Sequence, residues 1–199
     1  MRAFHYYVES INTECPFAGY PCNKEQDFTS DVCKVCPPEG CPYMGFHADK
    51  TKLSLGQRQK IYLTTNDQKP FCMYHLELTV KMSSENGQTE KGYITVDIVG
   101  DQGRTNEVRL NSWPINFEVG KNYLFSVPTA SDLGKVHTLK ISFYHVSSFL
   151  DIFQFGLRHP QIYIDEIEIF YQEKNKKFRF SLADFSVETD QSVIVFNQN

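Results

Sequence analysis

Four cysteines lie within twenty residues of this chain, in the pattern C-x10-C-x2-C-x4-C. A zinc site and a disulfide framework are the two competing interpretations. Zinc needs four converging ligands, usually from two separated knuckles, and only Cys33 and Cys36 form a C-x2-C knuckle here. Two more cysteines make the total even, as a disulfide framework requires. We therefore expect disulfides, no metal site and an extracellular protein. The six cysteines are Cys15, Cys22, Cys33, Cys36, Cys41 and Cys72.

Composition narrows the class of partner. The chain has 199 residues, of which 41% are hydrophobic, and a formal net charge of −4. This charge gives no reason to expect nucleic acid as a partner. No apolar run is long enough for a transmembrane helix. Met1-Arg2-Ala3 leads directly into an amphipathic segment and not into an apolar signal sequence, so we expect that a signal peptide is missing from this stretch.

The periodicity divides the chain into two parts. Phe4, Tyr7, Val8 and Ile11 follow helical spacing, and a loop region rich in Pro, Gly and Cys comes after them. Beyond it, short strand-like segments alternate with turn signals, which predicts a mostly β, antiparallel sandwich. The boundary is placed between 1–58 and 59–199. Strands are expected at 60–65, 74–82, 92–98, 105–110, 122–127, 136–146, 161–171, 176–183 and 192–197, with hairpin turns at 85–88 and 100–103.

The segment 147–160, S-S-F-L-D-I-F-Q-F-G-L-R-H-P, is unusually apolar for a connection between two strands. Large apolar side chains on a connection indicate either a loop folded back on its own domain or a surface meant for an apolar partner. The residues alone leave both interpretations open. The candidate lipid-contact residues are Phe149, Leu150, Ile152, Phe153, Phe155 and Leu157.

The tryptophan, the basic run near the C-terminus and the histidines are expected to have ordinary structural roles. We expect Trp113, the only tryptophan, to be a half-buried residue at the sandwich edge rather than a membrane anchor. A basic run near the C-terminus, formed by Lys174, Lys176, Lys177 and Arg179, is typical of a solvated hairpin. The six histidines are scattered and form no metal-binding or catalytic spacing. No cofactor is expected.

Several segments resemble one known family. They are R-A-F-H-Y-Y-V-E-S-I at 2–11, F-A-G-Y-P-C at 17–22, C-K-V-C-P-P-E-G-C-P-Y-M-G-F-H-A-D-K at 33–50 and Y-L-T-T-N-D at 62–67. In this order they resemble the pancreatic-type lipase family across the join of its catalytic and C-terminal domains. P-F-C-M-Y-H at 70–75, together with Cys15, is most similar to the secreted sn-1-cleaving phospholipase branch.

The resemblance implies a fold and a set of disulfides. The N-terminal part would be a short helix and a disulfide-rich tail of an α/β-hydrolase domain, followed by a PLAT/LH2 sandwich. The implied pairs are Cys22–Cys33 and Cys36–Cys41, with Cys15–Cys72 from the phospholipase branch. In this family the connection at 147–160 carries the loop that meets lipid, and some relatives bind heparan sulfate through the C-terminal domain.

The resemblance also implies what this stretch lacks. The catalytic histidine would be the residue just before Met1, and no G-x-S-x-G nucleophile motif occurs in the chain. We therefore expect the C-terminal part of a secreted lipase or phospholipase, inactive alone, that binds a lipid interface; a protein partner or heparan sulfate is a further candidate. The alternatives are a stand-alone PLAT module without chemistry and an adhesion sandwich unrelated to lipid. The upstream coding sequence would separate them.

Overall fold

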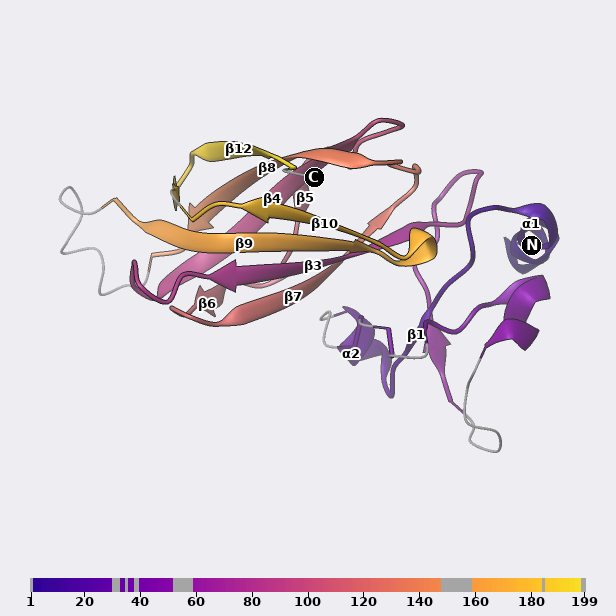
Figure 1. Cartoon of the computed structure of the whole chain (residues 1–199). Helices are drawn as coiled ribbons and strands as arrows, with labels where there is room; N and C mark the ends of the chain where they lie inside the picture. The colour runs from indigo at the N-terminus through magenta and orange to yellow at the C-terminus, as the bar shows by residue number, and fades with distance from the viewer. Residues whose placement is uncertain are drawn as a thin grey trace. The chain divides into compact units, whose positions relative to one another are not determined.

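The fold is described from a computed structural model of the chain (Figure 1). The residues that the structure describes are 2–29, 33–34, 36–37, 40–51, 59–147, 159–183 and 185–197. They form two compact units, which are described one at a time. The first unit comprises Met1–Glu77, Ser126–Asp132 and Tyr171–Asn175, and the second comprises Leu78–Phe125, Leu133–Phe170 and Lys176–Asn199.

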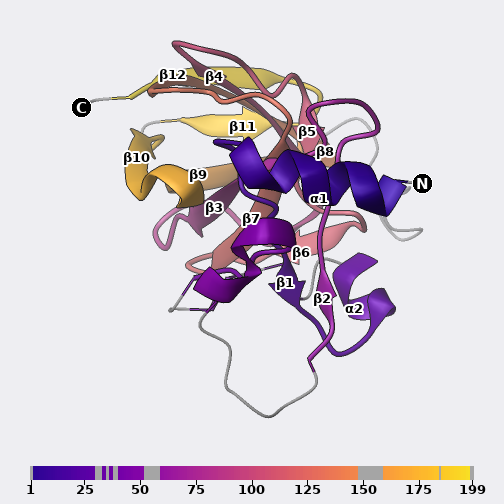
Figure 2. The ribbon, with the colours of Figure 1, turned by 90° about the vertical axis from the view of Figure 1, so that its right-hand side faces the viewer.

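The first unit is built from short elements and loops. Its helices are α1 (Arg2–Asn12), α2 (Glu25–Thr29), the 3-10 helix η1 (Gly45–Lys50) and the 3-10 turn η3 (Gln172–Lys174). Strands β1 (Tyr20–Pro21) and β2 (Ile61–Tyr62) pair antiparallel in a separate two-stranded sheet, as Figure 2 shows. The segment predicted as a strand at 60–65 thus pairs with β1 and not with a sandwich strand. The boundary predicted between 58 and 59 borders the undescribed residues 52–58 and stays a prediction.

Two antiparallel sheets make the sandwich, and they form two layers in Figure 1. The first has the order β10 (Lys176–Ser181), β9 (Gln161–Tyr171), β3 (Tyr74–Met82), β7 (Asn122–Thr129), with β11 (Ser186–Glu188) also paired to β9. The second has the order β12 (Ser192–Phe196), β8 (Val136–His145), β4 (Glu90–Gly100), β5 (Val108–Arg109), with β6 (Ile115–Phe117) also paired to β4. The predicted mostly β sandwich is confirmed.

The sandwich core comes from the strand faces that alternate inward. Because side chains on a strand point to opposite faces with a period of two, one face of each strand can be buried. Fully buried members of the second unit include Leu78, Val80, Ile94, Ile98, Leu139, Ile141, Phe143 and Phe180. The irregular alternation seen in the sequence of β9 also has a structural origin. Its buried positions shift phase at Asp165 and Glu166, two successive half-buried residues.

One predicted hairpin is confirmed and the other is wrong. At 100–103 the Gly100 amide donates to the Gly103 carbonyl at 2.9 Å and β4 turns back toward β5. At 85–88, by contrast, the chain leaves β3 in one sheet and enters β4 in the other. A turn signal marks a reversal of the chain but not which strands pair, and both strands find other partners across the shared core.

Candidate lipid-facing site

The six predicted lipid-contact residues, Phe149, Leu150, Ile152, Phe153, Phe155 and Leu157, lie outside the described residues. The two ends of their segment are described. The Val146 amide donates to the Lys91 carbonyl at 2.8 Å, and the Thr189 amide donates to the Pro160 carbonyl at 2.8 Å. The segment therefore leaves and re-enters the sandwich at the end where β4 begins and β8 finishes.

Gly92 marks this end of the sheet. It pairs with His145 of β8 on one side and with Ile115 of β6 on the other. Since neighbouring strands are about 4.8 Å apart, His145 and Ile115 are separated by roughly 10 Å. The apolar segment starts just after His145, and the turn that carries Trp113 finishes just before Ile115. The strand register therefore brings Trp113 and the ends of the predicted lipid-contact segment to the same end of the sandwich.

Trp113 corrects our expectation. It was predicted to be half-buried at the sandwich edge, yet it is 71% exposed. The residue sits on the turn between β5 and β6 and not within a strand, so the alternation of buried and exposed positions along a strand does not apply to it. An exposed indole is amphipathic and suits an interface that is apolar on one side and wet on the other.

Asn111 holds the turn that presents this tryptophan. Its side-chain amide nitrogen donates to the carbonyls of Gly92 at 3.0 Å and Trp113 at 2.6 Å. Its side-chain oxygen accepts from the Ile94 amide at 3.0 Å. Asn111 is only 6% exposed, so these bonds satisfy a buried amide and tie the turn to β4. Sequence reasoning missed this residue; the signal was an Asn just before the turn sequence S-W-P.

A buried polar pair lies beneath the same end. His145 Nδ1 is 3.3 Å from a Glu90 carboxylate oxygen, and the side chain of Glu90 is only 2% exposed. The His145 amide also donates to Thr189 Oγ1 at 3.0 Å, which links β8 to the chain just after β11. These contacts anchor both ends of the apolar segment to the sandwich. Neither residue was a candidate in the sequence, where Glu90 is an ordinary charged residue at the start of a strand.

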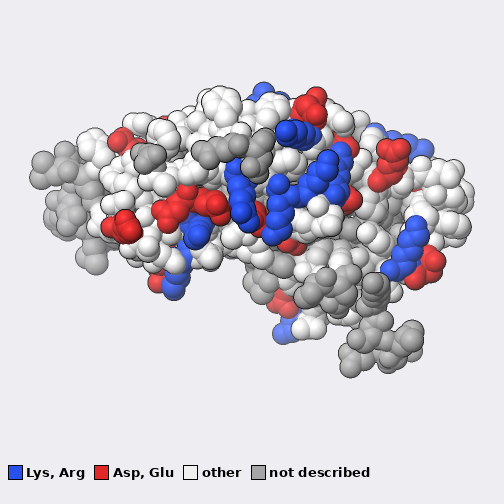
Figure 3. Space-filling view, viewed as in Figure 1, with Lys and Arg blue, Asp and Glu red and all other residues white. Residues whose placement is uncertain are grey.

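Three of the four cations in the predicted basic run, Lys174, Lys177 and Arg179, form ion pairs. Lys177 Nζ lies 2.8 Å and Arg179 Nε 3.0 Å from the two carboxylate oxygens of Glu168. The hydrogen bond from Lys177, supported by Arg179, lowers the pKa of Glu168 below its ordinary value. In the first unit, Lys174 Nζ lies 2.7 Å from an Asp132 carboxylate oxygen. Figure 3 shows blue Lys and Arg side chains next to red Asp and Glu side chains in the part of the surface where Figure 1 draws β10.

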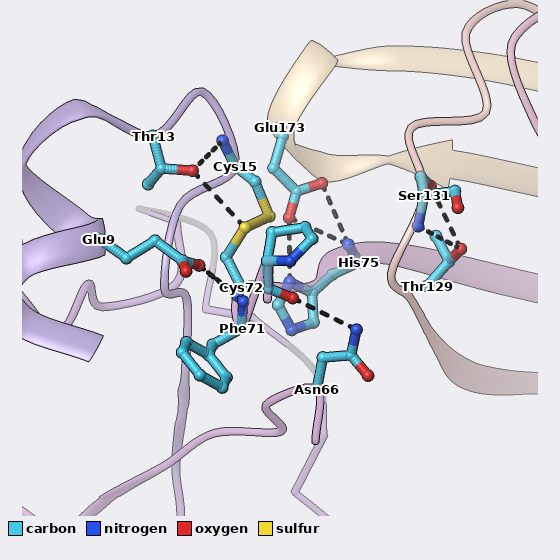
Figure 4. The surroundings of a disulfide bond; sticks show 11 residues. Glu9, Thr13, Cys15, Asn66, Phe71, Cys72, His75, Thr129, Ser131 and Glu173 are labelled. Carbon is cyan, nitrogen blue, oxygen red and sulfur yellow. Dashed lines mark hydrogen bonds and ion pairs between the residues drawn. A yellow bond between two sulfur atoms is a disulfide. The ribbon is translucent and has the colours of Figure 1, made fainter. Parts of the chain in front are cut away.

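The structure contains three disulfides, and their pairs are those that the family resemblance implied. They are Cys15–Cys72, Cys22–Cys33 and Cys36–Cys41. Figure 4 shows the first of them in its surroundings. One Glu9 carboxylate oxygen accepts from the amides of Phe71 at 2.7 Å and Cys72 at 3.0 Å, so α1 is tied to the strand entry beside that disulfide.

His75 and Glu173 form a second buried pair, in the first unit. The Glu173 carboxylate accepts from both the amide and the ring Nδ1 of His75, at 3.0 Å and 2.9 Å (Figure 4). His75 is 1% exposed, so its ring is buried. Among the described residues, no group of three or more His, Cys, Asp or Glu side chains converges as a metal site would require. None of the described helices has the length and apolar character needed to cross a bilayer.

One face of α1 is a further exposed apolar surface. Phe4, Tyr7, Val8 and Ile11 are 64%, 50%, 47% and 37% exposed. The opposite side of the helix packs inward: Tyr6 contacts Phe17 and Phe71, and Ser10 is buried. The helix therefore has one side that packs on described residues of this chain and one side that exposes large apolar side chains.

Comparisons with known proteins agree with this division of the chain. The Lipase family model matches residues 1–71, and the PLAT/LH2 domain model matches residues 76–196. Inactive pancreatic lipase-related protein 1 of Homo sapiens is 30% identical over 70% of this chain and 29% of its own length. Pancreatic triacylglycerol lipase of Sus scrofa is 34% identical over 55% of this chain and 24% of its length. Lipase member H of Oryctolagus cuniculus is 29% identical over 69% and 31%.

Solved structures support the fold alone. The crystal structure of Delta413-417:GS LOX has a TM-score of 0.51 at 16% identity and covers 63% of this chain and 16% of that one. The chain spans less than a third of the length of the three lipase relatives named above. Because the PLAT/LH2 model covers more than half of the chain and the Lipase model covers the segment before it, the chain belongs to the pancreatic-type lipase family and carries that family's PLAT/LH2 domain.

Proposed function

We propose that this chain is the interface-binding C-terminal part of a secreted ester hydrolase that acts on acylglycerols or phospholipids. The observation that carries the proposal is Trp113, 71% exposed on a turn that Asn111 ties to the sheet at the end where the apolar segment 147–160 is rooted. The three disulfides and the membership of a lipase family fit an extracellular location.

The exposed face of α1 supports the proposal that this chain is part of a longer ester hydrolase. A monomeric soluble protein rarely leaves a contiguous stripe of large apolar side chains in water. A stripe on a helix whose other face already packs in the lipase segment is the expected appearance of a helix that a larger hydrolase domain covers. We therefore propose that Phe4, Tyr7, Val8 and Ile11 pack against the remainder of a lipase domain in the longer protein.

Trp113 and the apolar segment 147–160 support the proposal that the chain binds a lipid interface. Burial of one large apolar side chain at a lipid surface contributes roughly 2 kcal/mol. Trp113 alone would bind weakly, and the six residues of the apolar segment would supply most of the remaining free energy. The ion pairs of Lys177 and Arg179 with Glu168 make heparan sulfate a weaker candidate than lipid, because a polyanion would have to displace that carboxylate.

The single tryptophan makes the test direct. We expect the intrinsic fluorescence of the chain to shift to shorter wavelength with phosphatidylcholine vesicles or triacylglycerol droplets, because Trp113 leaves water. Partitioning should depend little on salt, since apolar burial drives it. The double variant Phe149→Ser with Phe153→Ser should cut partitioning by roughly two decades, at about 1.5 kcal/mol for each side chain.

Two measurements would contradict the lipid-interface proposal. The first is a fluorescence maximum unmoved by a large excess of either lipid. The second is a sharp loss of thermal stability in the Phe149→Ser, Phe153→Ser variant with unchanged vesicle binding, which would place those residues in the core. The variant Asn111→Ala tests whether the turn must hold Trp113 in place: it keeps the indole but removes the hydrogen bonds of the turn, and it should weaken binding to lipid.

Hydrolysis by the 199-residue chain is a separate question. The chain carries no G-x-S-x-G motif, so we expect no turnover of a short-chain nitrophenyl ester above the buffer rate. Turnover that a serine-directed phosphonate abolishes would show that this expectation is wrong. The same assay on the longer protein, with acylglycerol and phospholipid substrates side by side, tests the proposed parent activity.

A further inference from the structure

We propose that Asn86 is a site of spontaneous deamidation, which replaces its neutral side chain by a carboxylate on the turn between β3 and β4. Asn86-Gly87 is the only Asn-Gly pair in the chain. It belongs to the sequence E-N-G-Q at 85–88, which does not form the hairpin that an Asn-Gly pair usually predicts. The modification does not depend on the proposed function, whereas its effect on lipid binding rests on that function.

The reaction needs the chain itself and water. The backbone nitrogen of Gly87 attacks the side-chain carbonyl carbon of Asn86 and forms a bond with it. The bond from that carbon to the side-chain nitrogen breaks, and the nitrogen leaves as ammonia with the proton of the Gly87 amide. Water then opens the resulting succinimide ring at either carbonyl and leaves aspartate or isoaspartate. Because the reacting groups belong to neighbouring residues, their effective concentration is high.

The structure leaves the attacking nitrogen accessible. A side chain on the residue after an asparagine shields that residue's backbone nitrogen, and glycine has none. Asn86 and Gly87 are both exposed, and they lie on the stretch 83–89 between two strands. Within the described part of the chain, neither the Asn86 side chain nor the Gly87 amide takes part in a hydrogen bond. No strand ladder therefore keeps the nitrogen of Gly87 away from the side chain of Asn86.

Asn111 shows what protects an asparagine in the same unit. It also precedes a small residue, Ser112. Its side-chain oxygen accepts from the Ile94 amide at 3.0 Å, and its side-chain nitrogen donates to two backbone carbonyls. It is buried, so its amide group is both held in place and shielded from water. The second unit thus contains an exposed Asn-Gly pair and, as an internal control, a buried asparagine that is held by hydrogen bonds.

The turn that carries Asn86 packs on the start of β9. A Cβ at Gly87 would lie 2.7 Å from the ring of Tyr163, so the backbone of Gly87 approaches this ring closely. The Ser83 amide donates to the Tyr163 carbonyl at 3.0 Å and fixes the start of the turn at the same residue. Isoaspartate lengthens the backbone between Asn86 and Gly87 by one carbon atom. It would therefore displace Gly87 from the Tyr163 ring.

Tyr163 also locates the turn relative to the lipid-facing site. It is the third residue of β9, which begins just after the segment 147–160. Strand β4, which follows the turn, begins at Glu90, two residues before Gly92. Figure 1 draws the last residues of β3 and the first residues of β9 at the same end of the sandwich. Deamidation would thus add a negative charge at the end that carries Trp113, and anionic lipid would repel it.

The modification is tested by incubation of the 199-residue chain in mildly alkaline buffer, followed by peptide mapping with mass spectrometry. We expect the peptide that carries Asn86 to gain about 1 Da within days, as OH replaces NH₂, and to separate into aspartate and isoaspartate forms. The peptide that carries Asn111 should react at least tenfold more slowly. The variant Asn86→Gln keeps a neutral amide but would have to close a larger ring, so it should stay unmodified. An unchanged mass at Asn86, or equal rates at Asn86 and Asn111, would overturn the proposal.

The effect on lipid binding is tested with Asn86→Asp, which carries the new charge without the longer backbone. At low salt it should bind vesicles of phosphatidylcholine with phosphatidylserine up to about fivefold more weakly than the fresh parent, and it should bind pure phosphatidylcholine equally well. The incubated parent should behave like this variant, and incubated Asn86→Gln like the fresh parent. Equal binding of the variant and the parent to the anionic vesicles would overturn the effect on binding. If the fresh parent binds neither kind of vesicle, the proposed function fails while the mass measurement still decides the modification.

Discussion

The two compact units are held together by different physical means. In the first unit one buried apolar cluster has only four members, Cys15, Phe17, Phe71 and Cys72, with Tyr6, Met44, Leu63 and Tyr74 packed around them. Three disulfides, and hydrogen bonds that single carboxylates such as that of Glu9 accept from backbone amides, also hold this unit together. The second unit contains no cysteine and relies on the apolar interior of its two sheets.

This difference indicates where each unit is vulnerable. A chain segment without a sufficient core needs covalent links to limit the entropy of its unfolded state. A sandwich with many fully buried side chains is insensitive to reducing agents but sensitive to any loss of packing volume. The following predictions test the contrast, in order of decreasing expected effect.

Removing core volume in the sandwich should have the largest effect. Phe143 is fully buried, and its ring packs edge-on against Phe117 with centroids 6.2 Å apart. We expect Phe143→Ala to lower the free energy of unfolding of the second unit by about 3–5 kcal/mol through lost transfer energy and a residual cavity. Chemical denaturation followed by circular dichroism measures this. Phe143→Leu, which keeps most of the volume, should cost clearly less, and equal losses would argue against a packed site.

Removing the disulfide that closes the longest loop, Cys15–Cys72, should destabilise the first unit. Cys15 and Cys72 are 57 residues apart, and the chain-entropy relation gives about 4 kcal/mol for a loop of that length. We expect the Cys15→Ser, Cys72→Ser variant to lose exchange protection in α1 and around Phe71, while Ile94, Ile141 and their neighbours keep theirs. Residue-resolved hydrogen exchange is the measurement. Loss of protection throughout the sandwich would show that the two units are not independently stabilised.

Much of the fold was predictable because period-two alternation reports burial directly. The segments 74–82 and 161–171 were predicted with the bounds that β3 and β9 have. The short strands β1, β6 and β11 were missed, because two or three residues carry no measurable alternation. Which sheet β4 joins could not be predicted either, because a turn signal at 85–88 does not say whether the next strand joins the same sheet.

The candidate site was predictable only in part. The apolar character of 147–160 is visible in composition alone. That Trp113 lies at the same end depends on Gly92 pairing with both β8 and β6, a register that no local pattern contains. The roles of Asn111 and Glu90 likewise depend on their burial, which a sequence does not display for isolated polar residues. Long-range pairing, not residue type, was the missing information.

A glycine in the first unit offers a finer test of how tightly its helices pack. Gly45 has a φ of +85°, and a Cβ there would overlap the Ser10 side chain of α1. Gly40 has a φ of +103°, but a Cβ there would meet no described atom within 4 Å. Gly40→Ala should therefore cost about 1–2 kcal/mol from backbone strain alone. Gly45→Ala should cost about 1–3 kcal/mol more through the clash, measured as accelerated exchange in α1. Equal losses of stability for the two variants would mean that α1 can move aside to accommodate the added methyl group.

The smallest expected effect concerns the surface of the sandwich. The hydrogen bond from Lys177, together with Arg179, lowers the pKa of Glu168 from its ordinary value of 4.5, although partial burial opposes the shift. A carboxyl whose pKa is lower in the folded chain stabilises that chain above its unfolded pKa, and the contribution is lost as pH falls through the folded value. Lys177→Gln should thus lower the melting temperature slightly at pH 7, by an amount that salt reduces, because the pair is partly exposed.

The difference between the variant and the parent should disappear below the folded pKa of Glu168, which a ¹³C carboxyl titration locates. Because Glu168 and Lys177 belong to the second unit, exchange rates in α1 should not change; a response there would contradict the separation of the two units.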